Sequence, residues 1–421
     1  MSSRLNRLPE VILLHILSLM PTKSSVQTSI LSKSWRYRWT LVTNLDFCYN
    51  GRHPSDERSF IKFVARVLNS CKTSKVKLFR LHLLCPKVRS LCVSKLIDKA
   101  IRLNVQELDI VSPKLDFPLS MFTCKTLTKL RITHKFNHYN NWVCPSSVYL
   151  PCLKTIDIAR YSSSIINVFK LIHGCPELES LSLEIAKRNN EEDYMFNIPT
   201  LKRLKLIFRS RTNYVINKVV LRVPNLEYLF VGGVLHSLFV MEDLSSLVGA
   251  SIACYKGMVN DMWFELLNEI RGVQNLSIQD VQFTSTLPTF PNMKHLELKG
   301  FSQYGLIPQF LESCPELKSL CIDEVVGRFF KKPKQSSWIE PKLVPACMLA
   351  NLTTIKCSVS RGWKCDIKFL EYMLGNAEVL KTVTIIGENL CLEEEKLVCA
   401  KLLELPRVSR HCKIHFRSLK K

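Results

Sequence analysis

The sequence predicts an α/β fold in which three short helices precede an irregular solenoid of repeats, each with one strand and one return segment. Two observations predict it. The first forty residues combine prolines, capping residues and helical apolar spacing. An apolar triplet then recurs through the rest of the chain, at intervals of mostly twenty to thirty residues.

The three N-terminal helices are bounded by residues with defined roles. Pro9 suits the first turn of a helix, where its missing N–H costs nothing, and Pro21 ends that helix because proline cannot continue the hydrogen-bond ladder. Thr22 is placed to cap a second helix that reaches residue 30. Ser32 is placed to cap a third helix, which carries Trp35.

The first helix carries more apolar surface than so small a unit can bury. Its apolar residues form two neighbouring stripes, Leu8, Ile12, Ile16 and Leu19 in one and Leu13, Leu17 and Met20 in the other. One stripe can cover the core of the unit. The other needs a partner, because a domain of roughly 40 residues cannot bury that much apolar surface alone.

The repeats are marked by apolar residues spaced apolar-x-x-apolar-x-apolar. The triplets are Leu78/Leu81/Leu83, Val105/Leu108/Ile110, Leu127/Leu130/Ile132, Leu153/Ile156/Ile158, Leu178/Leu181/Leu183, Leu201/Leu204/Leu206, Leu226/Leu229/Val231, Val273/Leu276/Ile278, Met293/Leu296/Leu298, Leu317/Leu320/Ile322, Leu352/Ile355/Cys357 and Leu380/Val383/Ile385. Their spacing is typical of leucine-rich repeats, which stack into a curved solenoid and usually bind partners on the concave face.

Repeated blocks support this organisation. Cys175-Pro-Glu-Leu and Cys314-Pro-Glu-Leu each follow an apolar helical segment, 165–172 and 307–311, and each begins the next strand. A third unit has a helical pattern around Phe369, with Gly375 placed to cap its end. The two cysteines occupy equivalent repeat positions, which favours a packing role for both thiols.

The first forty residues closely resemble the F-box of plant F-box/leucine-rich-repeat proteins. The resemblance is carried by Leu8-Pro9, Ile12-Leu13, Ile16-Leu17, Pro21-Thr22-Lys23, Ser29-Ile30-Leu31-Ser32-Lys33, Trp35-Arg36-Tyr37 and Trp39. Val11 stands where the family usually has an acidic residue, and Ser34 where it often has a basic one. Neither difference removes an apolar anchor.

From about Trp338 onward the chain resembles the FBD region that closes many of these proteins. The residues that carry it are Trp338, Pro341, Val344-Pro345, Cys347, Leu352, Gly362, Tyr372-Met373-Leu374, Asn376-Ala377, Pro406-Arg407, Ser409, Cys412, Ile414 and Phe416. Together with the F-box, this region makes the chain resemble the plant F-box/FBD/leucine-rich-repeat family over nearly its full length. The expected domains are an F-box at 1–45, leucine-rich repeats at 46–335 and an FBD-like region at 336–421, which continues the solenoid.

The resemblance implies a function. In that family the F-box binds a Skp1-like adaptor, and through it a cullin, so the chain is expected to be the substrate-recognition adaptor of a Skp1-cullin-F-box ubiquitin ligase. It would be a non-catalytic component that captures a protein substrate with its repeats. The residues expected to enter the Skp1-like groove are Leu8, Pro9, Ile12, Leu13, Ile16, Leu17, Leu31 and Trp35.

Composition limits the alternatives. No apolar stretch approaches the ~20 residues of a membrane span. The 17 cysteines are odd in number and scattered, which indicates a reducing compartment, the nucleus or the cytoplasm. A signal peptide formed by Arg4, Arg7 and residues 11–20 is a weaker interpretation, since no clean cleavage site follows.

The net charge of +23 supports a competing hypothesis. Between residues 72 and 102 nine basic residues accompany one acid, Asp98. This stretch is either a solvated basic face or a surface that binds nucleic acid or another polyanion. Residues 331–337 are interpreted as a linker or a short nuclear-import signal, and residues 189–193 as an exposed loop. An F-box relic outside any ligase is a third possibility.

No catalytic site or cofactor is expected. The sequence lacks a phosphate loop, a nucleophile elbow and a zinc-protease helix. The pairs His134/His138 and His411/His415 share a four-residue spacing, but each adjoins a predicted strand, so structural or solvent-facing histidines are favoured over metal ligands.

Overall fold

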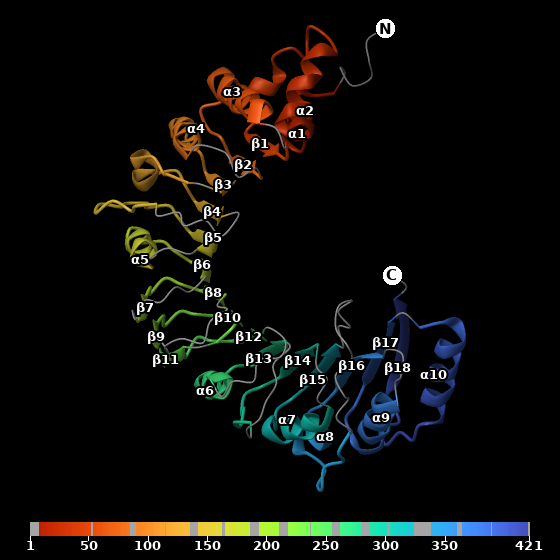
Figure 1. The fold of residues 1–421 in the computed structure, drawn as a ribbon. Coiled ribbons are helices and arrows are strands. Elements are labelled where there is room, and N and C mark those ends of the chain that lie inside the picture. The colour runs from red at the N-terminus through yellow and green to blue at the C-terminus, as the bar shows by residue number, and fades with distance from the viewer. Residues whose placement is uncertain are drawn as a thin grey trace. The chain divides into compact units, whose positions relative to one another are not determined.

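The computed structural model describes residues 8–51, 54–84, 90–113, 115–134, 142–161, 165–185, 193–209, 218–235, 237–254, 262–279, 287–300, 304–323, 338–359, 364–388 and 390–419 (Figure 1). The chain forms two compact units. The first comprises Met1–Asn190 and Thr200–Ser210, and the second Glu191–Pro199 and Arg211–Lys421. Residues 189–192 of the predicted loop at 189–193, His138 and the predicted linker at 331–337 lie outside the described residues.

The first unit begins with short helices that pack against its first strand. They are α1 (Glu10–Ser18), α2 (Thr22–Gln27) and the 3₁₀ helices η2 (Thr28–Ile30) and η3 (Arg38–Leu41). Pro9 precedes α1 and Pro21 precedes α2. Thr22 is the first residue of α2 instead of its cap, and its hydroxyl accepts a hydrogen bond of 2.7 Å from the backbone N–H of Asp46. The side chain of Thr22 therefore ties α2 to the sheet.

The predicted third helix requires a correction. Residues 34–37 form turns, and only η3 follows, so Trp35 lies on a turn. The Ser32 hydroxyl shares a 2.8 Å hydrogen bond with the Ser34 hydroxyl and caps no helix. Serine is favoured at turns as well as at helix N-caps, so a serine alone does not distinguish the two.

A parallel sheet forms the rest of the first unit. Its strands, in sheet order, are β1 (Asn44–Tyr49), β2 (Leu78–Leu83), β3 (Glu107–Ser112), β4 (Lys129–His134), β5 (Thr155–Tyr161), β6 (Ser180–Ile185) and β8 (Arg203–Phe208). The helices are α3 (Pro54–Ser70), α4 (Ser90–Arg102), η4 (Leu119–Thr123) and α5 (Ile166–His173). Figure 1 shows α3, α4 and α5 on one side of these strands.

The repeat triplets form buried rows that cross the sheet. In the first unit one row pairs Phe79, Leu108, Leu130, Ile156, Leu181 and Leu204 across successive strands. All six are at most 1% exposed. A row of this kind fixes the register, since a slip of one residue would turn every apolar side chain to the other face. In the first predicted triplet Leu81 and Leu83 are fully buried, as expected, but Leu78 is half-buried. The fully buried residues with the triplet spacing are Val76, Phe79 and Leu81.

The second unit contains two parallel sheets. The larger has the order β10 (Tyr228–Gly233), β12 (Gly249–Cys254), β13 (Asn275–Gln279), β14 (His295–Lys299), β15 (Ser319–Asp323), β16 (Thr354–Val359), β17 (Thr382–Glu388) and β18 (Lys413–Leu419). The smaller has the order β11 (Leu238–Glu242), β9 (Lys218–Arg222) and β7 (Tyr194–Asn197). Its helices are α6 (Met262–Glu269), η5 (Tyr304–Leu306), α7 (Ile307–Ser313), α8 (Ala346–Ala350), α9 (Lys364–Asn376) and α10 (Leu392–Glu404).

The helical segments predicted from the repeated blocks are confirmed as α5 and α7. The segment around Phe369 belongs to α9, which continues past the predicted cap at Gly375 and ends at Asn376. The parallel strands and intervening helices confirm the α/β repeat architecture, with register rows that run through each unit.

Candidate functional site

The candidate site is the N-terminal end of the first unit, where α1 divides its apolar residues between a core and the surface. Leu13 and Leu17 have no exposed surface, and they pack with Trp35 and Val42 into a small core that Met20 adjoins. The buried hydroxyl of Ser25 donates a 2.8 Å hydrogen bond to the carbonyl oxygen of Leu17, which satisfies a backbone group at the end of α1.

The other stripe of α1 is exposed. Leu8 and Ile16 are each 37% exposed, Ile12 is 47% exposed and Leu19 is 71% exposed. Ile12 and Ile16 lie one turn apart on α1, Leu8 precedes the N-cap residue Pro9, and Leu19 is the C-cap residue; we call these four exposed residues the α1 stripe. The predicted division of this helix into a core stripe and an unpartnered stripe is confirmed.

The eight residues expected to contact a partner fall into two groups. Leu8, Pro9, Ile12, Ile16 and Leu31 are exposed. Leu13, Leu17 and Trp35 are buried in the core of the unit. A fully buried side chain cannot contact a partner without repacking, so these three position α1 and leave contact to the exposed group.

Further exposed apolar residues of this unit were absent from the expected set. Within residues 8–45 they are Val11, Leu19, Ile30, Tyr37 and Leu41. The spacing of Leu19 from Ile12 and Ile16 was a sufficient signal for that residue. Tyr37 is distinguished by two cations, because the guanidinium of Arg36 and the ammonium of Lys72 lie 5.7 and 5.6 Å from the centre of its ring.

Polar side chains on neighbouring strands of the first unit's sheet form ion pairs with one another. Arg80 bridges Asp46 and Asp109, at 3.0 and 3.1 Å, and the Nε2 atom of His82 lies 3.1 Å from the other oxygen of Asp109. Burial opposes ionisation of Asp109, but its hydrogen bonds and charge interactions with His82, Arg80 and Arg131 outweigh it and lower the pKa. Arg131 also pairs with Asp157 at 3.0 Å.

The larger sheet of the second unit repeats this arrangement. Ser277 donates to Glu297 at 2.9 Å, and Lys299 pairs with the same carboxylate oxygen at 2.8 Å. Burial opposes ionisation of Glu297, but the hydrogen bonds from Lys299 and Ser277 outweigh it and lower its pKa. These side chains present a polar surface of fixed geometry, which suits recognition of a folded or extended protein surface.

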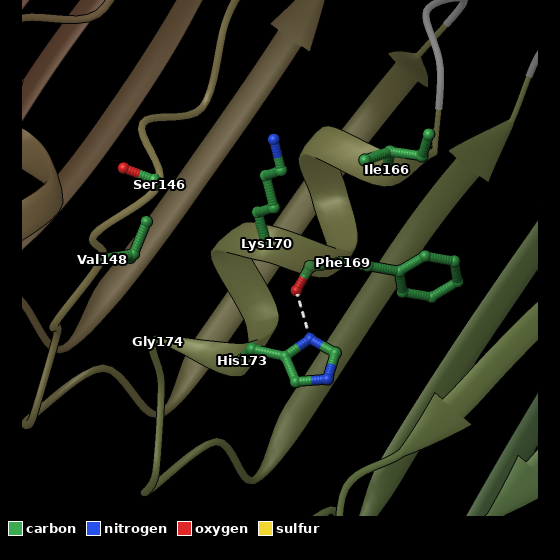
Figure 2. Close-up of a pocket in the computed structure, with 7 residues that line it drawn as sticks. All are labelled: Ser146, Val148, Ile166, Phe169, Lys170, His173 and Gly174. Carbon is green, nitrogen blue, oxygen red and sulfur yellow. Dashed lines mark hydrogen bonds between the residues drawn. The ribbon is translucent and has the colours of Figure 1, made fainter.

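A hollow of about 400 Å³ lies beside α5 (Figure 2). Ser146 and Val148 of the preceding loop face Lys170 and His173 across it. His173 donates its Nδ1 hydrogen to the carbonyl oxygen of Phe169 at 2.7 Å, within its own helix. The residues that line the hollow include no carboxylate, and no hydrogen bond joins Ser146 to His173 among them. The hollow thus lacks the nucleophile–base pair of a covalent catalyst.

The cysteines of the repeated blocks are packing residues, as predicted. Cys175 donates its Sγ hydrogen to the carbonyl oxygen of Leu171 at 3.1 Å, and burial raises its pKa to about 12. Cys314 has no exposed surface, and burial raises its pKa as well. Thiolates are the reactive form, so both thiols are inert at neutral pH.

The histidine pairs also have ordinary environments. His134 is the last residue of β4, and burial lowers its pKa to about 4. His411 precedes β18 and His415 lies within it; both are exposed, whereas Cys412 is buried, as predicted. Within the described ranges, no three His, Cys, Asp or Glu side chains gather as metal ligands. No helix in this part of the chain is long and apolar enough to cross a membrane.

Comparison with protein families divides the chain into three matched regions. Residues 5–46 match the F-box domain, and residues 340–385 match the FBD. Residues 93–241 match a model described as the LRR repeats of FBD-associated F-box protein At5g56370. The F-box match contains the α1 stripe, Leu31 and the small core.

Relatives with the same three parts match almost end to end. Putative F-box/FBD/LRR-repeat protein At4g13965 of Arabidopsis thaliana is 28% identical, over 98% of this chain and 96% of the relative. F-box/FBD/LRR-repeat protein At4g26340 of the same plant is 29% identical, over 98% of this chain and 99% of the relative. The chain thus has an F-box, parallel repeats and an FBD in the same order as the F-box/FBD/LRR-repeat proteins that it matches.

Proposed function

We propose that this protein is the substrate-recognition adaptor of a Skp1-cullin-F-box ubiquitin ligase. Residues 1–45 bind a Skp1-like adaptor, residues 46–335 hold a protein substrate, and residues 336–421 complete the repeat array. The protein contributes position: it holds the substrate near a transferring enzyme supplied by the other components.

The exposed α1 stripe is the observation that carries this proposal. Four aliphatic side chains, two within α1 and one at either end of it, are left exposed to water, while the adjacent residues Leu13 and Leu17 fill the core. An amphipathic helix with anchors at such positions binds by inserting them into an apolar groove of a partner.

The stripe offers enough apolar surface to matter. The exposed parts of its side chains amount to about two whole aliphatic side chains. Removing that surface from water contributes roughly 3–6 kcal/mol before the entropy cost of association. Pro9 and Leu31, which are also exposed, enlarge the same contribution.

The sheets support the substrate-holding part of the proposal. Their exposed polar side chains are held in place by partners on neighbouring strands, as Arg80 is by Asp46 and Asp109. A surface already ordered in the free protein loses little side-chain entropy when a substrate binds.

Variants of the α1 stripe test the docking step. Ile12→Asp/Ile16→Asp places two charges in the proposed contact without touching the core. Loss of the apolar contact and the cost of desolvating two carboxylates are expected to weaken adaptor binding by at least roughly 100-fold. Surface plasmon resonance with an immobilised Skp1-type adaptor measures the loss.

A matched control uses two exposed leucines of α10, Leu397→Asp/Leu403→Asp. This variant carries the same change in charge and removes even more exposed apolar surface, and it is expected to bind like the wild type. Equal binding by both variants would remove the α1 stripe from the interface, and the docking proposal with it.

A further inference from the structure

A second surface of the first unit has the features of a binding site. It is a groove of about 540 Å³ at the junction of α3, α4 and the segment leading into η4. Its lining includes Asn69 from α3, Lys95, Asp98, Lys99 and Arg102 from α4, and Pro118. Figure 1 shows α3 and α4 side by side on the helical side of the sheet.

The groove carries positive charge that its own acid does not neutralise. One oxygen of Asp98 accepts hydrogen bonds from Arg102, with Nε and Nη2 each at 3.0 Å, and the other accepts a 2.7 Å bond from the Ser120 hydroxyl. Lys99 donates to the neutral amide oxygen of Asn69 at 2.9 Å. Among the described residues, neither Lys95 nor Lys99 forms an ion pair with a carboxylate.

The two lysines are presented together. Positions 95 and 99 are one turn apart on α4, so their side chains share a face of the helix. The bond from Lys99 to Asn69 crosses from α4 to α3 and holds its ammonium group at the groove. Pro118 adds an apolar wall, and Leu119, which is largely exposed, extends it.

We propose that this groove binds an acidic peptide segment of a partner protein. Carboxylate or phosphate groups of the peptide contact Lys95 and Lys99, and a neighbouring apolar side chain packs on Pro118. The lining has no aromatic ring on which a base can stack, which favours a peptide over single-stranded nucleic acid. This site is separate from the α1 stripe, and its assignment does not depend on adaptor binding.

Fluorescence anisotropy with the full chain tests the assignment. Three labelled peptides are compared: glutamate pairs alternating with leucine, the same peptide with phosphoserine for one glutamate of each pair, and the same peptide with glutamine for every glutamate. We expect both acidic peptides to bind and the glutamine peptide to bind at least roughly tenfold more weakly, because exposed ion pairs each contribute a small but additive attraction. The phosphoserine and glutamate arms identify which anion is preferred.

Charge variants locate the site. Lys95→Glu/Lys99→Glu is expected to weaken binding of the acidic peptides roughly tenfold or more, and Lys95→Gln/Lys99→Gln less, since it removes attraction without adding repulsion. The control, Lys413→Glu/Arg417→Glu on β18, makes the same change in net charge at exposed positions of the second unit. Circular dichroism melting curves establish that each variant is folded.

Two results would overturn the proposal. Equal affinity of the acidic peptides for folded Lys95→Gln/Lys99→Gln and for the wild type would show that the peptides bind outside the groove. An oligothymidylate that binds more tightly than both peptides, and loses affinity in the same groove variants, would assign the groove to nucleic acid. We expect the groove variants to bind the Skp1-like adaptor like the wild type. A failure of the peptide-binding proposal would therefore not affect the proposal that the α1 stripe binds the adaptor.

Discussion

Two adjacent residues of α1 are predicted to have opposite roles, and alanine substitutions separate them. Leu13 has no exposed surface and Ile12 is 47% exposed. Leu13→Ala removes buried methyl groups and leaves a cavity between α1 and Trp35, which costs about 2–5 kcal/mol. Ile12→Ala removes surface that is half in water and replaces it with the best helix former, so its cost is expected to stay under about 1 kcal/mol.

Amide hydrogen exchange measures this difference within the N-terminal helices alone. A local loss of 2–5 kcal/mol speeds exchange of protected α1 and α2 amides by roughly 30-fold to 5,000-fold. Amides of β13 to β15, in the second unit, serve as the internal reference and are expected to remain unchanged. Equal acceleration by Leu13→Ala and Ile12→Ala, or none by Leu13→Ala, would contradict the division of α1 into a core stripe and an exposed stripe.

Two further predictions concern pH. The lowered pKa of Asp109 means that its contribution to stability is complete above its unfolded pKa of about 3.9 and is lost as pH falls through the lower folded value. Asp109→Asn, which weakens the contacts of Arg80 and His82, is therefore expected to cost about 1–3 kcal/mol at pH 7 and much less near pH 2, as measured by urea unfolding; an equal cost at both values would refute the reasoning. Because burial lowers the pKa of His134 to about 4, against about 6.5 unfolded, its contribution is complete above pH 6.5 and falls towards pH 4. Between pH 7 and pH 5 the free energy of unfolding of the wild type should fall by about 2 kcal/mol more than that of His134→Leu. An equal fall in both proteins would show that His134 is already protonated in the folded state at pH 5.

Most of the repeat architecture is predictable because its signal is repeated many times. Two strand residues that are two positions apart face the same side of the sheet. Where both of these residues are large and apolar, the triplet predicts the position of the strand and its register with the next strand. The exceptions follow from the same rule. Leu78 is apolar but lies at the wrong parity, and β12 was missed because its buried triplet, Leu247/Ala250/Ile252, includes an alanine.

The small sheet of β7, β9 and β11 was not predicted at all. Its strands are four or five residues long, and their buried positions do not share one spacing. These strands pair because successive return segments stack on one another, which is a matter of tertiary packing. Local sequence contains no equivalent of the triplet for these segments.

The candidate site was predicted in outline and refined by burial. Helical spacing separates the stripe of Ile12 and Ile16 from the stripe of Leu13 and Leu17, but spacing alone does not show which one faces the core. The answer depends on where Trp35 and Val42 pack. Trp35 lies on a turn and Val42 follows a 3₁₀ helix, so helical spacing does not predict which side of α1 they contact. Local propensity at Ser32 favoured a helix that the structure replaces with turns.

We propose that α1 binds a Skp1-like adaptor through apolar contact. Isothermal titration calorimetry of the full chain with a Skp1-type adaptor, at two ionic strengths and two temperatures, tests it most directly. We expect binding with a negative heat-capacity change, because apolar surface is buried, and with little dependence on salt, because apolar contacts are not screened by ions. Absence of binding by folded protein, or binding that disappears at high salt, would contradict it.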